Sequence, residues 1–243
     1  MELRGRVALV TGAGRRVGRA IALALAGRGM RIAIHHHDSS REAEKLRAEI
    51  AANGGTAERF QADLTEARAA HDLPREVAER MGGLDVLINS AAVMKRAAVE
   101  DTTPELWDEV MNLNLRAAFF CAQGAIPFLR KARGKIVNMA DVGGLAPWKH
   151  YAAHSISKAG VVMLTQTLAL AFAPDVTVNG IAPGAILVPE QWDQKARDHL
   201  AHTTPLQRLG SPDDVTAAIL YLLEGGDYVT GETIVVDGGR LIR

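Results

Sequence analysis

The chain has 243 residues with 28 basic and 28 acidic side chains, so its formal net charge is zero. A balanced charge gives no electrostatic reason to expect nucleic acid or an anionic membrane as a partner. The single cysteine, Cys121, excludes an internal disulfide. No run of about 18 apolar residues indicates a membrane span, and no apolar leader follows Met1. We therefore expect a cytoplasmic protein that does not contact a membrane.

Short apolar runs alternate with longer amphipathic segments along the whole chain. The segments typical of helices are 17–28, 40–53, 66–81, 104–130, 151–172 and 213–223. The runs typical of strands are 7–11, 31–36, 57–61, 85–89, 135–139, 176–181 and 233–236. This alternation predicts an α/β fold, a Rossmann-type doubly wound parallel sheet of about seven strands with helices on both faces. We expect one domain over residues 1–243, including an irregular, mobile segment that caps the substrate at about 185–204.

A glycine-rich turn, residues 11–18 with the sequence TGAGRRVG, joins the first expected strand to the first expected helix. Glycines permit a tight turn and let backbone N–H groups approach a phosphate, and the helix N-terminus adds partial positive charge. This position in the chain predicts a dinucleotide site at the carboxyl ends of the strands. The expected contacts within the turn are Gly12, Arg15, Arg16, Val17 and Gly18.

The second expected strand ends in three histidines, with His36 at the tip. An acidic residue at the tip binds a ribose 2′-hydroxyl and favours NAD(H), but Asp38 lies two residues beyond it. Hydroxyls and bases suit a 2′-phosphate instead, and these are Ser39, Ser40, Arg41 and Arg15 or Arg16 of the first turn. His36 and His37 are also expected cofactor contacts. We therefore expect NADP(H), with NAD(H) as the alternative. Adjacent histidines on an extended strand point to opposite sides, so we expect no metal site.

Further short motifs resemble those of the short-chain dehydrogenase/reductase family, and they follow the family's order over nearly the whole chain. Besides the turn at 11–18, they are Asp63, Asn89-Ser90-Ala91-Ala92, Asn114, Pro183-Gly184 and Val236-Asp237-Gly238-Gly239. The resemblance implies a nicotinamide-dependent oxidoreductase. It also implies cofactor contacts from Asp63, Leu64, Asn89, Ser90, Ala91, Lys158, Pro183, Gly184 and Ile186.

His154 and Lys158 stand four residues apart on the expected helix 151–172 and therefore on one face of it. In the family this helix carries Tyr-x-x-x-Lys, in which the tyrosine moves the proton and the lysine binds the nicotinamide ribose. Here the tyrosine is replaced by His154 and the family's catalytic serine by Asp141. An imidazolium can donate a proton because the unperturbed pKa of histidine is about 6.5. Asp141 and Tyr151 remain alternative proton donors.

The resemblance assigns Asn114 to the asparagine that holds a relay water in the family. A purely structural role, in which Asn114 bridges the backbone of a kinked helix, remains open. Arg16 and Asp141 also occupy the positions of an arginine and an aspartate in the family's pteridine reductase branch. Met94, however, stands where that branch has an aromatic residue that stacks on the pterin. We expect Met94, Trp148 and Tyr151 to face the substrate.

Three functions follow from these residues. The first is hydride transfer between NADP(H) and a carbonyl or imine group of a small substrate, and the second is reduction of a pteridine or dihydrofolate. The third is cofactor binding with little or no catalysis. The two long helices at 104–130 and 151–172 carry apolar residues on more than one face. One sheet cannot cover all of them, so we expect a homotetramer or a homodimer.

Overall fold

Seven parallel strands form one sheet in the computed structural model, which describes residues 1–188 and 192–242. The strand order is β3-β2-β1-β4-β5-β6-β7. The strands are β1 Val7–Val10, β2 Arg31–His36, β3 Thr56–Gln61, β4 Val86–Asn89, β5 Lys135–Met139, β6 Thr177–Pro183 and β7 Thr233–Val236. The central strands are buried along their whole length, as expected for a parallel sheet covered on both faces. The predicted fold class is therefore confirmed.

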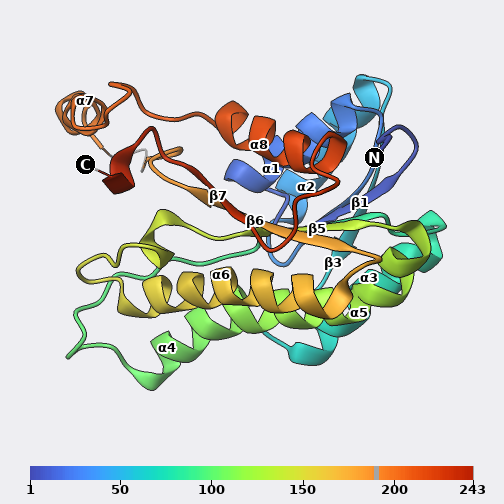
Figure 1. The fold of residues 1–243 in the computed structure, drawn as a ribbon, viewed down its shortest axis with the longest axis horizontal. Coiled ribbons are helices and arrows are strands. Elements are labelled where there is room, and N and C mark those ends of the chain that lie inside the picture. Colours follow the sequence, from blue (N-terminus) through green and yellow to red (C-terminus); the bar gives the residue numbers. More distant parts are fainter. Residues whose placement is uncertain (189–191, 243) are drawn as a thin grey trace.

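Helices cover both faces of this sheet (Figure 1). One layer holds α1 Arg16–Gly27, α2 Ser40–Ala52 and α8 Pro212–Glu224, and its apolar residues form one core with the sheet. The other layer holds α3 Ala67–Met81, α4 Pro104–Met111, α5 Ala117–Ala132 and α6 Ala152–Phe172. Residues of α3, α5 and α6 form the second core. Both faces of the sheet are thus covered by helices. A ligand therefore has to approach an edge of the sheet where the strands end.

The order of the strands reverses between β1 and β4. From β1 the chain runs outward through β2 to β3, and it then returns to pair β4 with the other side of β1. Ligands of doubly wound sheets bind at the carboxyl ends of the strands near such a switch point. Thr11 follows β1 at this edge, Asn89 ends β4, Asp141 lies two residues beyond β5 and Gly184 follows β6.

The segment predicted as one helix at 104–130 contains a wider turn. A π-helical stretch, η1 Asn112–Arg116, joins α4 to α5, and α5 continues to Ala132. Such π-turns often occur at functional sites. In this protein the π-turn carries Asn114 on the side facing α6.

The prediction that residues 185–204 are irregular was wrong for part of that segment. A helix, α7 Gln194–His202, begins after Asp193, whose carboxylate accepts a hydrogen bond from the backbone N–H of Ala196 at 2.7 Å. Residues 189–191 lie outside the described part of the chain. None of the residues of α7 is buried, and its apolar residues are few, with only Ala196, Leu200 and Ala201 on one side, so the sequence gives a weak helix signal.

The helix α6 is long and apolar enough to cross a membrane by length and composition alone. In this structure it packs along the sheet and beside α5, as Figure 1 shows. Two polar side chains of its first turns, His154 and Lys158, are buried against the protein. One side of α6 therefore joins the core, whereas apolar side chains such as Met163 and Leu170 stay exposed.

Candidate active site

The turn after β1 is shaped by close backbone approaches. Gly12 has a φ of +66°, and a Cβ there would lie 2.9 Å from the Cα of Ala91. A Cβ at Gly18 would lie 2.5 Å from the carbonyl oxygen of Gly12. The first turn of α1 carries no acidic residue, and Arg15 at its N-cap makes no side-chain cap. The first backbone N–H groups of α1 therefore point out of the helix end, as a phosphate site requires.

The two arginines of this turn point in different directions. The guanidinium of Arg15 pairs with Glu42 of α2 at 3.2 Å. Arg16 takes the left-handed conformation that glycine favours, with a φ of 52°, and donates a hydrogen bond to the carbonyl oxygen of Leu187 at 2.7 Å. Arg16 thus ties the turn to the segment that follows β6.

At the tip of β2 the three histidines differ in their surroundings. His35 and His36 are buried, whereas His37 is exposed. Ser39 is also buried, and a Cβ at Gly14 would lie 2.7 Å from its Oγ. Ser39 therefore lies directly beside the glycine turn. Within the described residues no group of three or more His, Cys, Asp or Glu side chains is placed to hold a metal ion.

The residues after β3 and β4 lie next to the same turn. Thr11 accepts hydrogen bonds from the N–H groups of Ser90 at 2.9 Å and Ala91 at 3.0 Å. Asn89 is buried and donates to Asn138 at 2.9 Å. After β3, the Asp63 carboxylate accepts from both the N–H and the hydroxyl of Thr65, which lowers the pKa of Asp63. These contacts fix three strand ends around one edge of the sheet.

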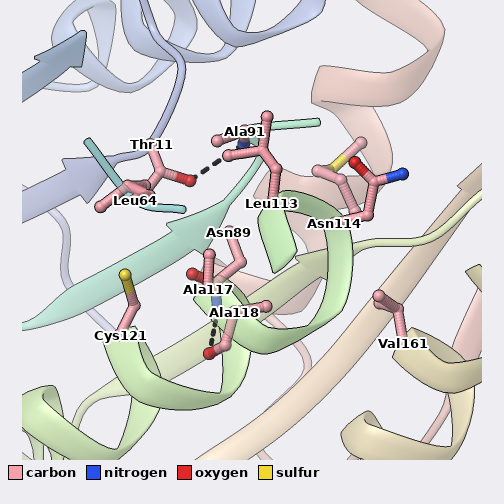
Figure 2. A pocket seen from close by; sticks show the side chains of 11 residues that line it. Thr11, Leu64, Asn89, Ala91, Leu113, Asn114, Ala117, Ala118, Cys121 and Val161 are labelled. Atoms are coloured by element: carbon pink, nitrogen blue, oxygen red, sulfur yellow. Dashed lines mark hydrogen bonds between the residues drawn. The ribbon is translucent and has the colours of Figure 1, made fainter. Parts of the chain in front are cut away.

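A small cavity lies beneath this edge, between the strand ends and α5 (Figure 2). Its volume of about 10 Å³ leaves room for one water molecule at most, so it is not a substrate cleft. Figure 2 shows Thr11, Leu64, Asn89 and Asn114 around it, each from a different segment of the chain.

At the end of β6, Pro183 is the last residue of the strand and Gly184 follows it against β7. The N–H of Gly184 donates to the carbonyl of Val236 at 2.9 Å, and a Cβ at Gly184 would lie 2.7 Å from the Cβ of Asp237. Ile186 is buried and packs in the same core as α1. The chain after β6 therefore folds back toward the glycine turn.

His154 lies in the first turn of α6 with only 4% of its surface exposed. Its Nε2 lies 3.9 Å from Oδ1 of Asp141, which is too long for a hydrogen bond but close enough for an ion pair when the imidazole is protonated. Within the described residues, neither ring nitrogen has a hydrogen-bond partner. The ring of Trp148 stacks on it, with centroids 6.0 Å apart and planes 20° apart. A polar ring enclosed in this way lacks compensation for its lost hydration.

Lys158 is buried one helical turn further along α6, and its Nζ donates to the carbonyl of Met139 at 2.6 Å. Burial lowers the pKa of Lys158 to about 8, while the negative charge of Asp141 acts in the opposite direction. The loop after β5 reaches this helix closely, because a Cβ at Gly144 would lie 2.5 Å from the backbone carbon of Lys158. This contact holds Asp141, whose carboxylate also accepts from the N–H of Gly143 at 2.7 Å.

Asn114 connects three segments. Its side chain accepts from the N–H of Val93 at 2.8 Å and donates to the Val93 carbonyl at 2.9 Å. It also donates to the hydroxyl of Ser157 at 3.0 Å, and Ser157 in turn donates to the carbonyl of His154 at 2.7 Å. The backbone-bridging role expected as an alternative is thus present, and Asn114 fixes the start of α6 relative to the loop after β4.

Tyr151, expected as the first residue of the helix 151–172, is the N-cap residue of α6, which begins at Ala152. The backbone of Tyr151 instead forms a bridge with Ala97, and its ring meets Trp148 edge to face with centroids 6.0 Å apart. Met94 and Trp148 are 52% and 38% exposed. Both side chains therefore lie at the surface, and the ring of Trp148 does so while it stacks on His154.

The strand order, the glycine turn at the switch point and the buried Lys158 beside His154 together define a dinucleotide-binding oxidoreductase of the Rossmann type. The family model described as enoyl-(acyl carrier protein) reductase matches residues 12–240. The chain therefore belongs to this family of short-chain dehydrogenases/reductases.

Relatives and a solved structure agree with this assignment. A 3-oxoacyl-[acyl-carrier-protein] reductase from Synechocystis is 35% identical over 99% of this chain and 98% of its own length. A 3β-hydroxysteroid dehydrogenase from Eggerthella lenta is 35% identical over 99% of this chain and 95% of its own. A structure titled as a short-chain alcohol dehydrogenase from Sinorhizobium meliloti superimposes with a TM-score of 0.93 and 32% identity, covering 99% and 98% of the two chains. None of these three is a pteridine reductase by name, so they do not favour that alternative.

Proposed function

We propose that this protein is an NADP(H)-dependent oxidoreductase that interconverts an oxo or imine group and its reduced form on a small substrate, with His154 moving the proton. The observation that carries this proposal is the enclosed imidazole of His154, which lies one helical turn from buried Lys158 and 3.9 Å from Asp141. The relatives named above supply the reaction class, since their names describe oxo-group reduction and hydroxyl oxidation.

The fit of a dinucleotide is supported by the shape of the glycine turn. A Cβ added at Gly12, Gly14 or Gly18 would lie within 3 Å of the backbone or of Ser39. The turn at the end of the helix is therefore too tight for side chains at these positions. Backbone N–H groups at the start of α1 and the exposed guanidinium of Arg15 bind the phosphates in this proposal. Asp63 and Leu64 border the adenine, and Pro183, Gly184 and Ile186 border the nicotinamide. A bound nicotinamide supplies or accepts the hydride.

In the direction of reduction, the imidazolium of His154 gives its Nε2 proton to the substrate oxygen or nitrogen. Asp141 attracts that positive charge from 3.9 Å, and Lys158 holds the ribose through an ammonium group, which its pKa of about 8 leaves mostly charged at pH 7. The Trp148 ring covers His154, so a substrate that reaches Nε2 has to displace it. Asn114 positions the start of α6 through Ser157. Asp141 and Tyr151 are the alternative donors.

The substrate in this proposal is apolar around its reactive group. Trp148 presents exposed apolar surface beside His154. Met94 presents exposed apolar surface on the loop after β4, which is joined to the loop of Trp148 by the hydrogen bond from the N–H of Ala97 to the carbonyl of His150 at 2.9 Å. A site lined in this way binds by apolar contact and orients its ligand by few polar groups.

The preference for NADP(H) over NAD(H) rests on the tip of β2. His36 ends the strand where an acidic residue would bind the 2′-hydroxyl, and Nδ1 of the buried His36 has no hydrogen-bond partner among the described residues. His37 and Ser39 follow at the same tip. A 2′-phosphate would supply an acceptor for Nδ1 of His36.

A homotetramer or homodimer in the cytoplasm completes the proposal. The helices α5 and α6 leave large apolar side chains on the surface, among them Phe119, Ile156, Met163 and Leu170. Exposed apolar side chains on neighbouring helices are typical of surfaces that a further subunit covers. Light scattering of the purified protein tests this, and a monomer at micromolar concentration would contradict it.

The function is tested by following NADPH oxidation with a panel of 3-oxoacyl thioesters, oxosteroids and a dihydropteridine. We expect turnover with an oxo substrate and a preference for NADPH over NADH in kcat/KM. Turnover with the dihydropteridine alone would favour the second function predicted from the sequence. Tight NADPH binding without turnover on the whole panel would identify a cofactor-binding protein instead.

A further inference from the structure

His35 makes a set of contacts that the proposed chemistry does not use. It is 2% exposed, at the end of β2 and one residue before the tip. Its Nδ1 accepts a hydrogen bond from the backbone N–H of Gly12 at 3.0 Å. Its Nε2 lies 3.1 Å from the carbonyl oxygen of Ala62. Because a carbonyl only accepts and an amide N–H only donates, the ring must be neutral and carry its proton on Nε2.

The two partners of this ring belong to the two loops that border the expected adenosine half of the cofactor. Gly12 is the first glycine of the turn after β1, and Ala62 comes directly before Asp63. The backbone of the same residue adds a third contact, since the N–H of Ala13 donates to the carbonyl of His35 at 3.0 Å. His35 therefore accepts hydrogen bonds from two consecutive backbone amides of the turn and also contacts the loop after β3.

This arrangement decides which amides of the turn face a phosphate. The N–H groups of Gly12 and Ala13 point at His35, so they are turned away from a ligand at the end of α1. The amides left for a phosphate are those that follow, at the N-terminus of α1. A ring that loses its acceptor nitrogen leaves the Gly12 N–H buried and unpaired, and the turn must move to satisfy it.

We propose that His35 is a positioning residue for the cofactor: its neutral imidazole joins the turn after β1 to the loop after β3 and so presets the phosphate site. The proposal rests on the proposed function, because it concerns the same cofactor. Burial supports it by lowering the pKa of His35 to about 4, which keeps the ring neutral at physiological pH.

Three variants separate the two hydrogen bonds. His35→Asn places a carbonyl oxygen close to the site of Nδ1 and retains an acceptor for Gly12. His35→Gln places an amide close to the site of Nε2 and retains a donor for Ala62. His35→Phe fills the same space with neither. His71→Gln, on the exposed side of α3, is the matched control.

The dissociation constant of NADP⁺ is measured by calorimetry at pH 7.5, and kcat is measured at saturating NADPH. We expect His35→Phe to weaken NADP⁺ binding about tenfold, His35→Asn to recover most of that loss and His71→Gln to match the unchanged protein. At saturating cofactor, kcat stays within about twofold in all four, whereas a general loss of structure lowers kcat as well. If His35→Phe and the unchanged protein bind NADP⁺ with equal affinity, the inference about His35 is wrong, while the proposed function still stands. No binding of NADP⁺ or NAD⁺ by the unchanged protein overturns the proposed function and this inference together.

A second measurement does not depend on any variant folding. The ¹⁵N chemical shifts of the imidazole in the unchanged protein at pH 6.5 report which ring nitrogen carries the proton. We expect His35 to be protonated on Nε2 and bare on Nδ1. A proton on Nδ1, or on both nitrogens, contradicts the proposed contact with Gly12.

Discussion

The two histidines His35 and His154 are buried to nearly the same extent, with 2% and 4% of their surfaces exposed, yet their rings are in opposite situations. Both nitrogens of His35 are hydrogen-bonded to backbone groups. Neither nitrogen of His154 has a partner within the described residues. Burying a polar group without a partner costs stability, so it persists where function requires it. Burial alone thus does not distinguish a structural histidine from a reactive one, whereas its hydrogen bonds do.

The largest expected effect comes from removing the imidazole of His154, the histidine proposed to be reactive. We expect His154→Ala to lower kcat by about 10²- to 10⁴-fold, the usual contribution of a positioned acid. Binding of NADP⁺ should change little, because the residues of the glycine turn are untouched. Steady-state kinetics with the best oxo substrate measure the loss, and His71→Ala is the control.

A different pattern would move the proton to another residue. If His154→Ala keeps most of its activity while Asp141→Asn loses it, the carboxyl group is the donor. Loss in Tyr151→Phe alone would assign the role to the tyrosine hydroxyl.

At the structural end of the comparison, the glycine turn beside His35 is expected to tolerate no added methyl group. Gly18→Ala places a Cβ 2.5 Å from the Gly12 carbonyl, so we expect a loss of about 3 kcal/mol in the free energy of unfolding. Gly27→Ala lies in the same helix α1 with nothing within 4 Å, and it should stabilise the protein by about 0.5 kcal/mol. Urea unfolding of both variants measures the difference. Equal stabilities would mean that the turn is not closely packed.

The sequence predicted the strands and helices around both histidines well, because each strand is a short apolar run bounded by glycine or polar residues. It did not predict the contacts of His35, since Gly12 and Ala62 are brought to it only by the pairing of β2 with β1 and β3. The family resemblance assigned Asp141 and His154 to one site, and Trp148 was expected to face the substrate, but the sequence did not predict that the Trp148 ring stacks on the imidazole. The helix α7 was missed because its apolar side is short, with only Ala196, Leu200 and Ala201, although Asp193 is a recognisable N-cap signal.

A fall in pH is expected to lower the stability of the protein through His35. The pKa of His35 is lowered from 6.5 to about 4 by burial, with His36 and His37 adding to the shift and the bond to Ala62 opposing it. Between these two pH values His35 is protonated in the unfolded chain but neutral in the folded protein. Stability therefore falls as pH falls from about 6.5 to about 4, by about 3 kcal/mol in total from this group.

Carboxylates such as Asp63 also lose stabilising contacts in acid, so the effect of His35 has to be isolated by comparison. Urea midpoints at pH 7 and pH 4.5 are compared for the unchanged protein and His35→Gln. The variant should show the shallower decline with acid. Parallel declines would indicate that His35 is protonated without penalty in the folded state.

Burial of Lys158, on the same helix as His154, is expected to lower the stability of the folded protein. Its pKa is lowered from 10.5 to about 8 by burial, so the folded protein releases a proton that the unfolded chain retains between these pH values. Below pH 8 this burial costs about 3 kcal/mol, and the penalty disappears as pH rises from about 8 to 10.5. Lys158→Met removes the penalty but also the bond to Met139, so we expect a net gain of about 2 kcal/mol at pH 7 together with loss of activity.

The matched control is a second buried lysine. Lys135 is 5% exposed, but its Nζ pairs with Asp227 at 2.6 Å and donates to Leu222 at 2.9 Å. Lys135→Met breaks these contacts and should destabilise the protein by about 1 kcal/mol. Opposite signs for the two substitutions, measured by thermal unfolding at pH 7, would show that burial of the charged lysine is destabilising at Lys158 and compensated at Lys135. Destabilisation by both would place Lys158 among the structural residues, and the contrast would then rest on the two histidines alone.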